Sequence, residues 1–243
     1  LYATIRQDLS SRVELSAEAR YSFRKARAES FIPISSLRVT NANPFFVSPN
    51  GSTSHTIQYA FADPSLEPLN LSGVESLAFS AGFDADLFGD WRASGYAAYA
   101  QETIRNRQGG IHSLILAEAL GNAADNPGTA YSAARDGFFN PFAGIGGTNP
   151  AALAAITSGY STARYRGDVR SANLQADGTV FQLPGGAVKV AVGGQYREEG
   201  FQSRGESYSS TVAPVPTTGF NRDRRVASVY GEVRIPIFGP DNR

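Results

Sequence analysis

Apolar and polar side chains alternate residue by residue along several long segments of this 243-residue chain. The alternation is clearest in 12–27, where every second position is apolar from Val13 to Phe23 and the positions between are polar. Successive side chains of a β-strand point to opposite faces, so the pattern predicts strands with one apolar and one polar face. We expect seven such strands, near residues 1–9, 12–27, 74–87, 91–104, 168–182, 187–200 and 223–237.

The connections between the expected strands are alternately short and long. Short turns, rich in turn-forming residues, are expected at 10–11, 88–90, 183–186 and 239–242. Long irregular connections are expected at 28–73, 105–164 and 202–221. This order predicts an antiparallel sheet with its short turns at one end and its long loops at the other. Inside the long loops we expect a partial strand at 55–62 and short helices at 112–120 and 149–158.

The residue types on the two faces favour a sheet that lies in lipid. The polar face mixes Arg, Glu, Asp, Ser, Gln and Gly, as in a water-filled lumen, and the apolar face is rich in Ala and Gly, which a protein core would replace with bulk. Aromatic residues stand where the apolar face approaches the long loops, at Tyr21, Phe23, Tyr99 and Tyr196. In 187–200 we expect Val188, Val190 and Val192 to face lipid and Lys189, Gln195 and Arg197 to face the lumen.

The expected fold class is therefore all-β: a partial transmembrane antiparallel β-barrel of about seven long strands. Strands of 13–16 residues exceed the usual five or six of soluble sheets. No segment has the roughly 18–20 consecutive apolar residues of a membrane-spanning helix. A soluble antiparallel sandwich or barrel is the alternative, since one face on a protein core would give the same alternation.

Composition argues against several functions. The 22 basic residues equal the 22 acidic ones, so no basic surface for nucleic acid is expected, and the absence of cysteine excludes thiol chemistry. The two histidines, His55 and His112, are expected in solvated loop positions. Glu198 and Glu199 are strand neighbours that point to opposite faces. We therefore predict no catalytic activity, no metal site and no cofactor.

Five segments carry a resemblance to a known family: Leu9–Lys25, Ala81–Glu102, Asp136–Ile156, Leu174–Phe201 and Arg225–Arg243. They resemble the β-barrel of TonB-dependent receptors of the Gram-negative outer membrane. The resemblance implies a 22-stranded barrel that is filled by an N-terminal plug domain. It also implies active uptake of a bulky, scarce solute such as a siderophore or a glycan, energised by TonB.

Under this resemblance, residues 1–243 are part of a single barrel domain, from the middle of the barrel, without the plug domain and the C-terminal strands. The implied location is the cell outer membrane. The implied partners are outer-membrane lipid, the remaining strands and plug of the same receptor, TonB through the N-terminal region, and the solute. A passive porin-like channel, a structural outer-membrane scaffold and a soluble binding protein are the alternative functions.

The expected ligand-binding surface combines the lumen wall and the long loops. Lumen candidates are Arg20, Arg24, Arg170, Gln195 and Arg197, whose alternative role is plain lumen polarity and cross-strand ion pairing. Loop candidates are the aromatic residues beside two Asn-Pro-Phe sequences, namely Phe45, Phe46, Phe138, Phe139 and Phe142. These rings either stack on a ligand or pack on one another as a lid.

Overall fold

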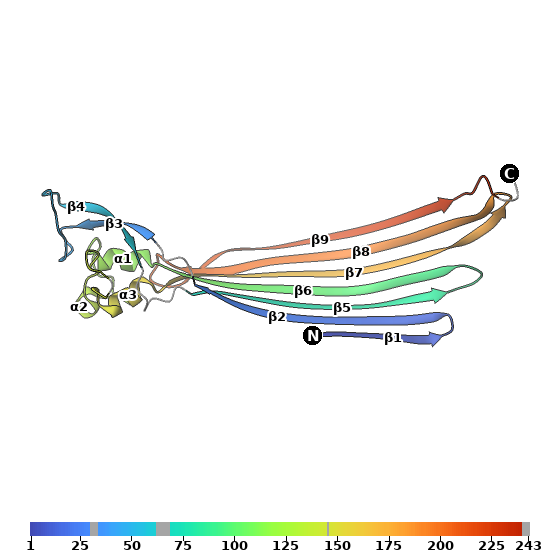
Figure 1. Ribbon diagram of the computed structural model, residues 1–243, viewed down its shortest axis with the longest axis horizontal. Helices are drawn as coiled ribbons and strands as arrows, with labels where there is room; N and C mark the ends of the chain where they lie inside the picture. The colour runs from blue at the N-terminus through green and yellow to red at the C-terminus, as the bar shows by residue number, and fades with distance from the viewer. Residues whose placement is uncertain (30–33, 62–68, 145, 240–243) are drawn as a thin grey trace.

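The computed structural model describes residues 1–29, 34–61, 69–144 and 146–239, and its main feature is one long antiparallel sheet. Seven strands follow one another in the order β1-β2-β5-β6-β7-β8-β9 (Figure 1). Their bounds are Tyr2–Ser10 (β1), Val13–Glu29 (β2), Leu69–Asp86 (β5), Arg92–Gly110 (β6), Gly159–Leu183 (β7), Gly186–Tyr208 (β8) and Val215–Arg234 (β9). The predicted seven-stranded antiparallel sheet is confirmed. Within the described residues it does not close, because β1 and β9 each pair on one side only.

The short turns all lie at one end of the sheet and the long connections at the other, as the alternating loop lengths predict (Figure 1). The strands run further toward the loop end than expected. β7 begins at Gly159 instead of near residue 168, and β8 continues to Tyr208. The predicted loop 202–221 therefore contracts to residues 209–214. Most of the turn predicted at 239–242 lies outside the described residues.

The two longest connections fold together at the loop end into a small unit, here called the cap, made of residues 34–61 and 111–158. It holds a two-stranded antiparallel sheet of β3 (Ile34–Thr40) and β4 (Ser54–Ala60), and the helices α1 (Ser113–Ala119), α2 (Ala133–Asp136) and α3 (Pro150–Ile156) (Figure 1). The predicted partial strand and both predicted helices are confirmed. Neither β3 nor α2 was predicted from the sequence.

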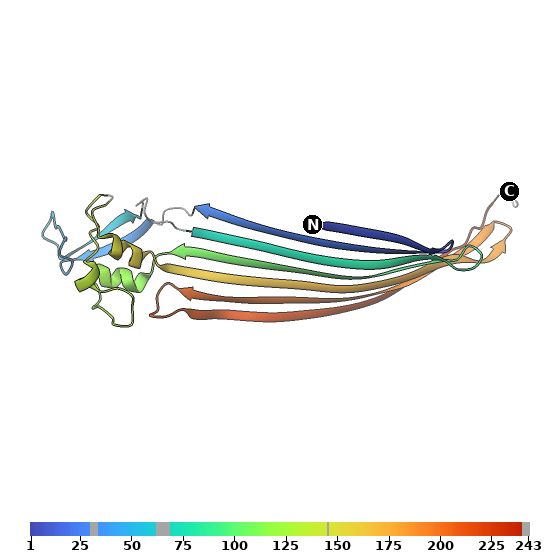
Figure 2. The same cartoon turned by 90° about the horizontal axis from the view of Figure 1, so that it is seen from below.

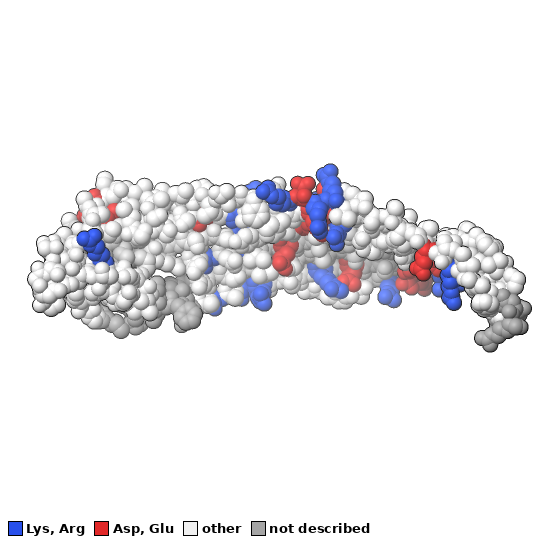
Figure 3. Space-filling view, turned by 90° about the horizontal axis from the view of Figure 1, so that it is seen from above, with Lys and Arg blue, Asp and Glu red and all other residues white. Residues whose placement is uncertain are grey.

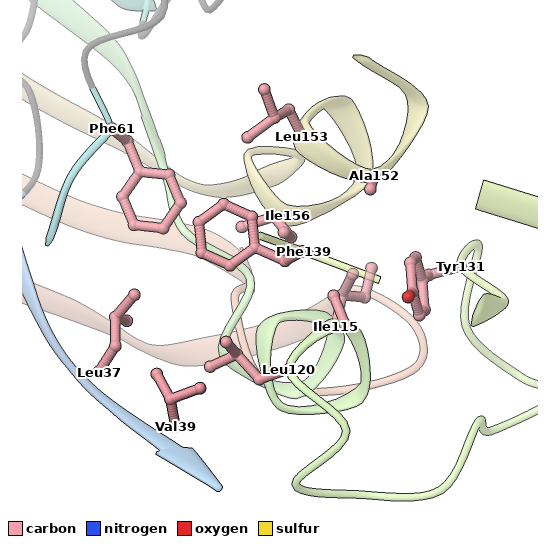
Figure 4. Close-up of a cluster of buried hydrophobic side chains, with 11 residues drawn as sticks. Leu37, Val39, Phe61, Ile115, Leu120, Tyr131, Phe139, Ala152, Leu153 and Ile156 are labelled. Atoms are coloured by element: carbon pink, nitrogen blue, oxygen red, sulfur yellow. The ribbon is translucent and has the colours of Figure 1, made fainter. Parts of the chain in front are cut away.

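The buried hydrophobic core of the described chain lies in the cap and not in the long sheet. Eleven side chains from β3, from the residue after β4, from the helices and from the segments between them form one cluster around Phe139 (Figure 4). They are Leu37, Val39, Phe61, Ile115, Ala119, Leu120, Tyr131, Phe139, Ala152, Leu153 and Ile156. Among the sheet residues whose side chains the structure describes, Val188 is the only buried apolar one. The expectation that Val188 is open to lipid is therefore wrong, because it lies covered beside the turn into β8 and a register shift in β7.

The register of the long sheet separates its two faces cleanly. Residues that pair directly share a face, and one such row crosses six strands as Ala17, Ala81, Ala97, Ala172, Tyr196 and Ala227. The next row, on the opposite face, is Glu18, Ser80, Ala98, Ser171, Arg197 and Val226. We call these the apolar face and the polar face. The alternation in the sequence is thus carried through the whole sheet.

The sheet is curved and not flat. It spreads its strands in the view down the shortest axis and again in the view turned by 90° (Figures 1 and 2). Charged side chains gather over the strands, while the end formed by the cap shows few (Figure 3). Among the described residues, no helix has both the length and the apolar character needed to cross a membrane.

Candidate binding surfaces on the sheet and the cap

The apolar face ends on an oblique edge below the cap. When each strand is followed toward the cap, the positions on this face are apolar up to one residue and polar beyond it. From β2 to β9 these last apolar residues are Phe23, Leu77, Tyr99, Ala172, Tyr196 and Ala227. Measured against the pairing rows, this edge drops by about six residues over five strand-to-strand steps. The whole drop occurs in the three steps from β2 to β7, and the edge stays in one pairing row from β7 to β9. With about 3.3 Å per residue and about 4.8 Å between strands, its average slope against the rows is about 40°. A plane drawn along this edge would cut the strands obliquely.

Three of the four lumen candidates that share the polar face have identifiable surroundings. Arg20 forms an ion pair with Glu18, and Arg197 Nε lies 3.0 Å from Glu199 Oε1. Glu199 also accepts from Arg224, whose Nη2 is 2.6 Å from Oε2. Gln195 pairs with Asn173 on β7. The Arg20–Glu18 and Arg197–Glu199 pairs each lie within one strand, and the Arg224–Glu199 pair joins β9 to β8, so the expected cross-strand pairing is found at one of the three. Arg24 adds a further basic residue opposite Val74.

Arg170 was expected on the same face as the other lumen candidates, but the pairing places it on the apolar face. It pairs directly with Tyr99 on one side and Glu198 on the other, and its guanidinium carbon lies 5.9 Å from the centre of the Tyr99 ring. The edge of the apolar face passes just below it, at Ala172. Above this oblique edge both faces carry charge, so the charge of Arg170 says nothing about its face.

A hydrogen-bonded chain on the polar face was missed by sequence reasoning. Tyr230 Oη donates to Gln175 Oε1 at 2.8 Å, and Gln175 Nε2 donates to Ser94 Oγ at 3.0 Å. Gly193 lies between them on β8, and a Cβ there would collide with the Tyr230 ring. The glycine therefore lets a tyrosine from β9 reach across β8 to β7. No sequence signal identifies this chain, because it depends on the register of four strands.

The aromatic candidates of the cap divide into buried and exposed rings. Phe139 is fully buried; its ring stacks on Phe61 at 5.6 Å and meets Tyr59 edge-on at 5.0 Å. Phe46 packs on the core and stacks on His55 at 5.4 Å. Phe138 is half-buried. The structure places Phe139 and Phe46 in packing roles, whereas Phe45 and Phe142 are each 41% exposed and remain open to a ligand.

The exposed phenylalanines are presented by two of four similar turns. Every Asn-Pro pair in the cap folds in the same way, with the asparagine Oδ1 accepting the backbone N–H of the residue two positions on. The four hydrogen bonds run from Phe45 to Asn43 (2.9 Å), Gly128 to Asn126 (2.9 Å), Phe142 to Asn140 (3.1 Å) and Ala151 to Asn149 (2.9 Å). Asparagine favours such turns because its side chain replaces a backbone acceptor.

His112 fastens the cap to the β8–β9 connection and is fully buried, so the expectation of a solvated position is wrong. Its Nδ1 accepts from the backbone N–H of Ile115 at 3.3 Å, as the N-cap of α1. Nε2 then donates to the carbonyl of Thr211 at 3.0 Å, and the ring meets Tyr208 edge-on at 4.4 Å. His55, in contrast, lies 3.3 Å from Ser48 Oγ at a partly buried position.

Acidic groups gather around Tyr131 in the cap. Burial raises the pKa of Tyr131 to about 12, and the nearby carboxylates Asp125, Asp136 and Glu118 add to this. A hydrogen bond from the Arg135 guanidinium lowers the pKa of Asp136. Within the described residues, no three His, Cys, Asp or Glu side chains are grouped so that they could hold a metal ion.

Comparison with known proteins gives no family assignment: no family model matches the chain, and no curated protein matches it in sequence at a significant level. The functional argument therefore rests on geometry and on the residues themselves. That geometry offers a ligand two surfaces, the polar face of the sheet and the exposed rings of the cap.

Proposed function

We propose that this chain forms part of the wall and the outer cap of an outer-membrane transport receptor. The observation that carries the proposal is the apolar face, which is broad and uncovered. Phe79 is 48% exposed, Leu174 58% and Val229 89%. Soluble proteins rarely leave a continuous apolar surface of this kind open to water. Lipid would cover it and would also fill the space above its many alanines and glycines.

The oblique edge of the apolar face supports the same conclusion. A lipid boundary is flat, whereas the strands of a transmembrane barrel are tilted by about 35–45°. The boundary must then cross the pairing rows at that angle, and the edge from Phe23 to Ala227 slopes against them by about 40° on average, with all of the slope between β2 and β7. Tyr99 and Tyr196 lie on the edge, where aromatic side chains bridge lipid and water.

The open edges of the sheet imply further strands in the membrane. An unpaired backbone edge is not tolerated in lipid, because each unmet N–H or C=O costs several kcal/mol. β1 and β9 would therefore pair with strands beyond those described, and the polar face would line the enclosed lumen. The ion pairs and the Tyr230–Gln175–Ser94 chain would then form a hydrated wall.

The presence of the cap favours a gated receptor, and not an open pore, as the function of the protein. It is a folded unit with its own core, and it stands at the loop end, where solute would arrive (Figures 1 and 4). Phe45 and Phe142 would offer rings to a bulky solute there. A siderophore or a glycan as solute, and import energised by TonB, rest on the resemblance to TonB-dependent receptors alone.

The membrane placement is tested with two neighbouring alanines on opposite faces, Ala97 and Ala98. Residues 1–243 contain no cysteine, so Ala97→Cys and Ala98→Cys each add a single labelling site to this part of the protein. Each is labelled with an environment-sensitive fluorophore in reconstituted membranes. We expect a spin-labelled lipid to quench the label at 97 and aqueous iodide to quench the label at 98. Iodide quenching at both positions would show a soluble sheet.

The transport class is tested by electrical recording of the full protein in planar bilayers. A gated receptor should show no steady conductance, because its lumen is obstructed until energy is supplied. Stable conductance steps would instead indicate the passive porin-like channel. A silent protein whose deletion changes the assembly of other envelope proteins but no solute uptake would indicate the structural scaffold.

A further inference from the structure

The cap is joined to the β8–β9 connection, residues 209–214, by hydrogen bonds from the start of α1. His112 Nε2 donates to the carbonyl of Thr211 at 3.0 Å. The backbone N–H and the hydroxyl of Ser113 both donate to the carbonyl of Ser209, at 2.7 and 2.9 Å. These three bonds connect residues that lie 96 and 99 positions apart in the sequence. We call them the junction.

Both ring nitrogens of His112 are engaged, one as an acceptor and the other as a donor. Nδ1 carries a lone pair, because it accepts the backbone N–H of Ile115 at 3.3 Å. Nε2 carries a proton, because it faces the carbonyl oxygen of Thr211. The neutral imidazole with its proton on Nε2 is the form that satisfies both bonds. The charged ring has a second proton on Nδ1, which would point at the N–H of Ile115.

The surroundings of His112 give a positive charge little compensation. The side chain is fully buried, and α3 and residues 209–214, which both contact it, contain no charged residue. Within the described residues, no carboxylate forms an ion pair with the ring. A buried charge without a partner costs far more free energy than a buried neutral group with its hydrogen bonds made. The junction therefore fits the neutral ring and not the charged one.

The ionisable groups on the other elements around the ring have partners of their own. They are Glu118 on α1, Arg107 on β6, Tyr160 on β7, and Glu206 and Tyr208 on β8. Glu206 accepts from Tyr160 Oη at 3.0 Å, and the guanidinium carbon of Arg107 lies 3.8 Å from the centre of the Tyr160 ring. Glu118 Oε2 accepts from the Thr129 hydroxyl at 2.8 Å. Tyr208 meets the imidazole with an edge-on ring contact at 4.4 Å.

We propose that His112 is a pH switch: its neutral ring holds the cap on the β8–β9 connection, and its protonation releases the cap. Histidine changes its charge between about pH 5 and 8, whereas the serine and backbone groups of the junction do not. The stabilisation by the ring is therefore complete at the upper end of this range and is lost as the pH falls. The core around Phe139 is built from apolar and aromatic side chains, so acid would open the junction and leave the cap folded.

The switch itself does not depend on the membrane placement, because the junction joins two segments at the loop end of the chain. Its consequence for transport does rest on the proposed function. A cap released from residues 209–214 would leave the loop end more open to an arriving solute in acid than at neutral pH. The quenching experiment at positions 97 and 98 does not involve the junction, so the two proposals can fail separately.

The experiment measures hydrogen exchange of the full protein in detergent between about pH 8 and about pH 5, with rates corrected for the intrinsic effect of pH on exchange. The amides of Ser113 and Ile115 report on the junction, because both take part in it or in the ring contact. The amide of Phe139, which donates to the carbonyl of Ala119 at 2.8 Å, reports on the cap core.

Two variants separate the switch from other effects of acid. His112→Gln keeps a side-chain N–H that can donate to Thr211 but takes up no proton in this pH range. The matched control is His55→Gln, which removes the other histidine of the cap; that ring is partly buried and lies 3.3 Å from Ser48 Oγ.

In the unmodified protein, we expect the protection of the junction amides to fall about tenfold or more toward pH 5, while that of Phe139 stays unchanged. His55→Gln should show the same fall, and His112→Gln should show none. A fall that persists in His112→Gln or disappears in His55→Gln would overturn the proposal, and so would constant protection in the unmodified protein.

If His112→Gln does not fold, NMR of the ring nitrogens in the unmodified protein decides the question. At about pH 8 the switch requires a neutral His112 ring with its proton on Nε2. Toward acid, the ring should become charged together with the loss of junction protection. A charged His112 ring in a junction that is still protected would contradict the proposal.

Discussion

The cap and the long sheet treat their apolar side chains in opposite ways. In the cap, Phe139 is fully buried among neighbours from β3 and the helices. In the sheet, the equally large Phe79 is 48% exposed, and its row continues across the strands without cover. The cap thus buries its large apolar side chains against one another, whereas the long sheet leaves its apolar face uncovered.

We expect the largest difference in lost stability between the variants Phe139→Ala and Phe79→Ala. Truncating Phe139 leaves a cavity in a packed core and should cost the cap about 3–5 kcal/mol. Under the proposed membrane placement, truncating Phe79 should cost about 2 kcal/mol or less, because lipid would fill the space and only the transfer of the ring would be lost. Hydrogen exchange of cap and sheet amides measures each loss where it occurs. Equal losses at the two sites would remove the distinction between the regions.

A charge placed on the sheet should give the next largest effect. Arginine at a lipid-facing position costs about 2–4 kcal/mol in the middle of a bilayer and about 0–1 kcal/mol near its interfaces. Under the proposed membrane placement Ala97 lies two residues inside the edge at Tyr99, so Ala97→Arg should reduce the stability of the protein by about 1–2 kcal/mol. Ala98→Arg, one residue away on the polar face, should be nearly neutral. Urea unfolding of the two variants in lipid vesicles compares them. A near-neutral Ala97→Arg would mean that water wets both faces.

Within the polar face, Gly193→Ala should lower stability by about 1–2 kcal/mol. The new methyl group would push the Tyr230 ring away and break its hydrogen bond to Gln175. Gly194→Ala is the control, because a Cβ there meets its nearest atom at an ordinary 3.4 Å. Thermal unfolding measures both variants, and similar shifts would show that the Tyr230 chain adds nothing to the wall.

The turn end of the sheet should respond to acid. Hydrogen bonds from the Thr179 hydroxyl and backbone N–H, with help from Lys189, lower the pKa of Asp90 from 3.8 to about 2. A folded pKa below the unfolded one means that the carboxylate stabilises this turn above about pH 4 and that the contribution is lost between pH 4 and 2. Hydrogen exchange at the β5–β6 turn follows this loss. Asp90→Asn should abolish the pH dependence.

The cap should respond to alkali instead. Tyr131 has its pKa raised from 10 to about 12, and its hydroxyl donates to the carbonyl of Gly137 at 2.8 Å. A raised folded pKa means that the stabilisation is complete below pH 10 and is lost as the pH rises toward 12. Tyr131→Phe keeps the ring and should remove the alkaline transition in cap hydrogen exchange. An alkaline transition that survives this change would belong to another group.

Sequence reasoning located the strands because a two-residue period survives any register. It failed beyond the oblique edge, where apolar and polar residues no longer alternate. Above that edge both faces are polar, so the beginning of β7 at Gly159 was missed, and Arg170 was placed on the wrong face. In the cap, the proline of α3 and the apolar run of α1 predicted helices. The strand β3 was missed because its alternation of apolar and polar residues is confined to the four residues from Leu37 to Thr40. Which phenylalanines are buried depends on contacts between distant segments, as with Phe139 and Phe61.

In the four Asn-Pro turns of the cap, the residue that fixes the backbone differs from the residue whose side chain follows two positions on. Each turn is fixed by an asparagine that holds a backbone N–H, so the side chain two positions on is not needed for the fold of its loop. Phe45 and Phe142 occupy two of these positions, and Gly128 and Ala151 occupy the other two. Gly128 has little room for a side chain, because a Cβ there would lie 3.2 Å from Val212 Cγ1, and Ala151 belongs to the first turn of α3. Phe45 and Phe142 are the two positions of this set that can be exchanged one at a time while the core around Phe139 stays unchanged.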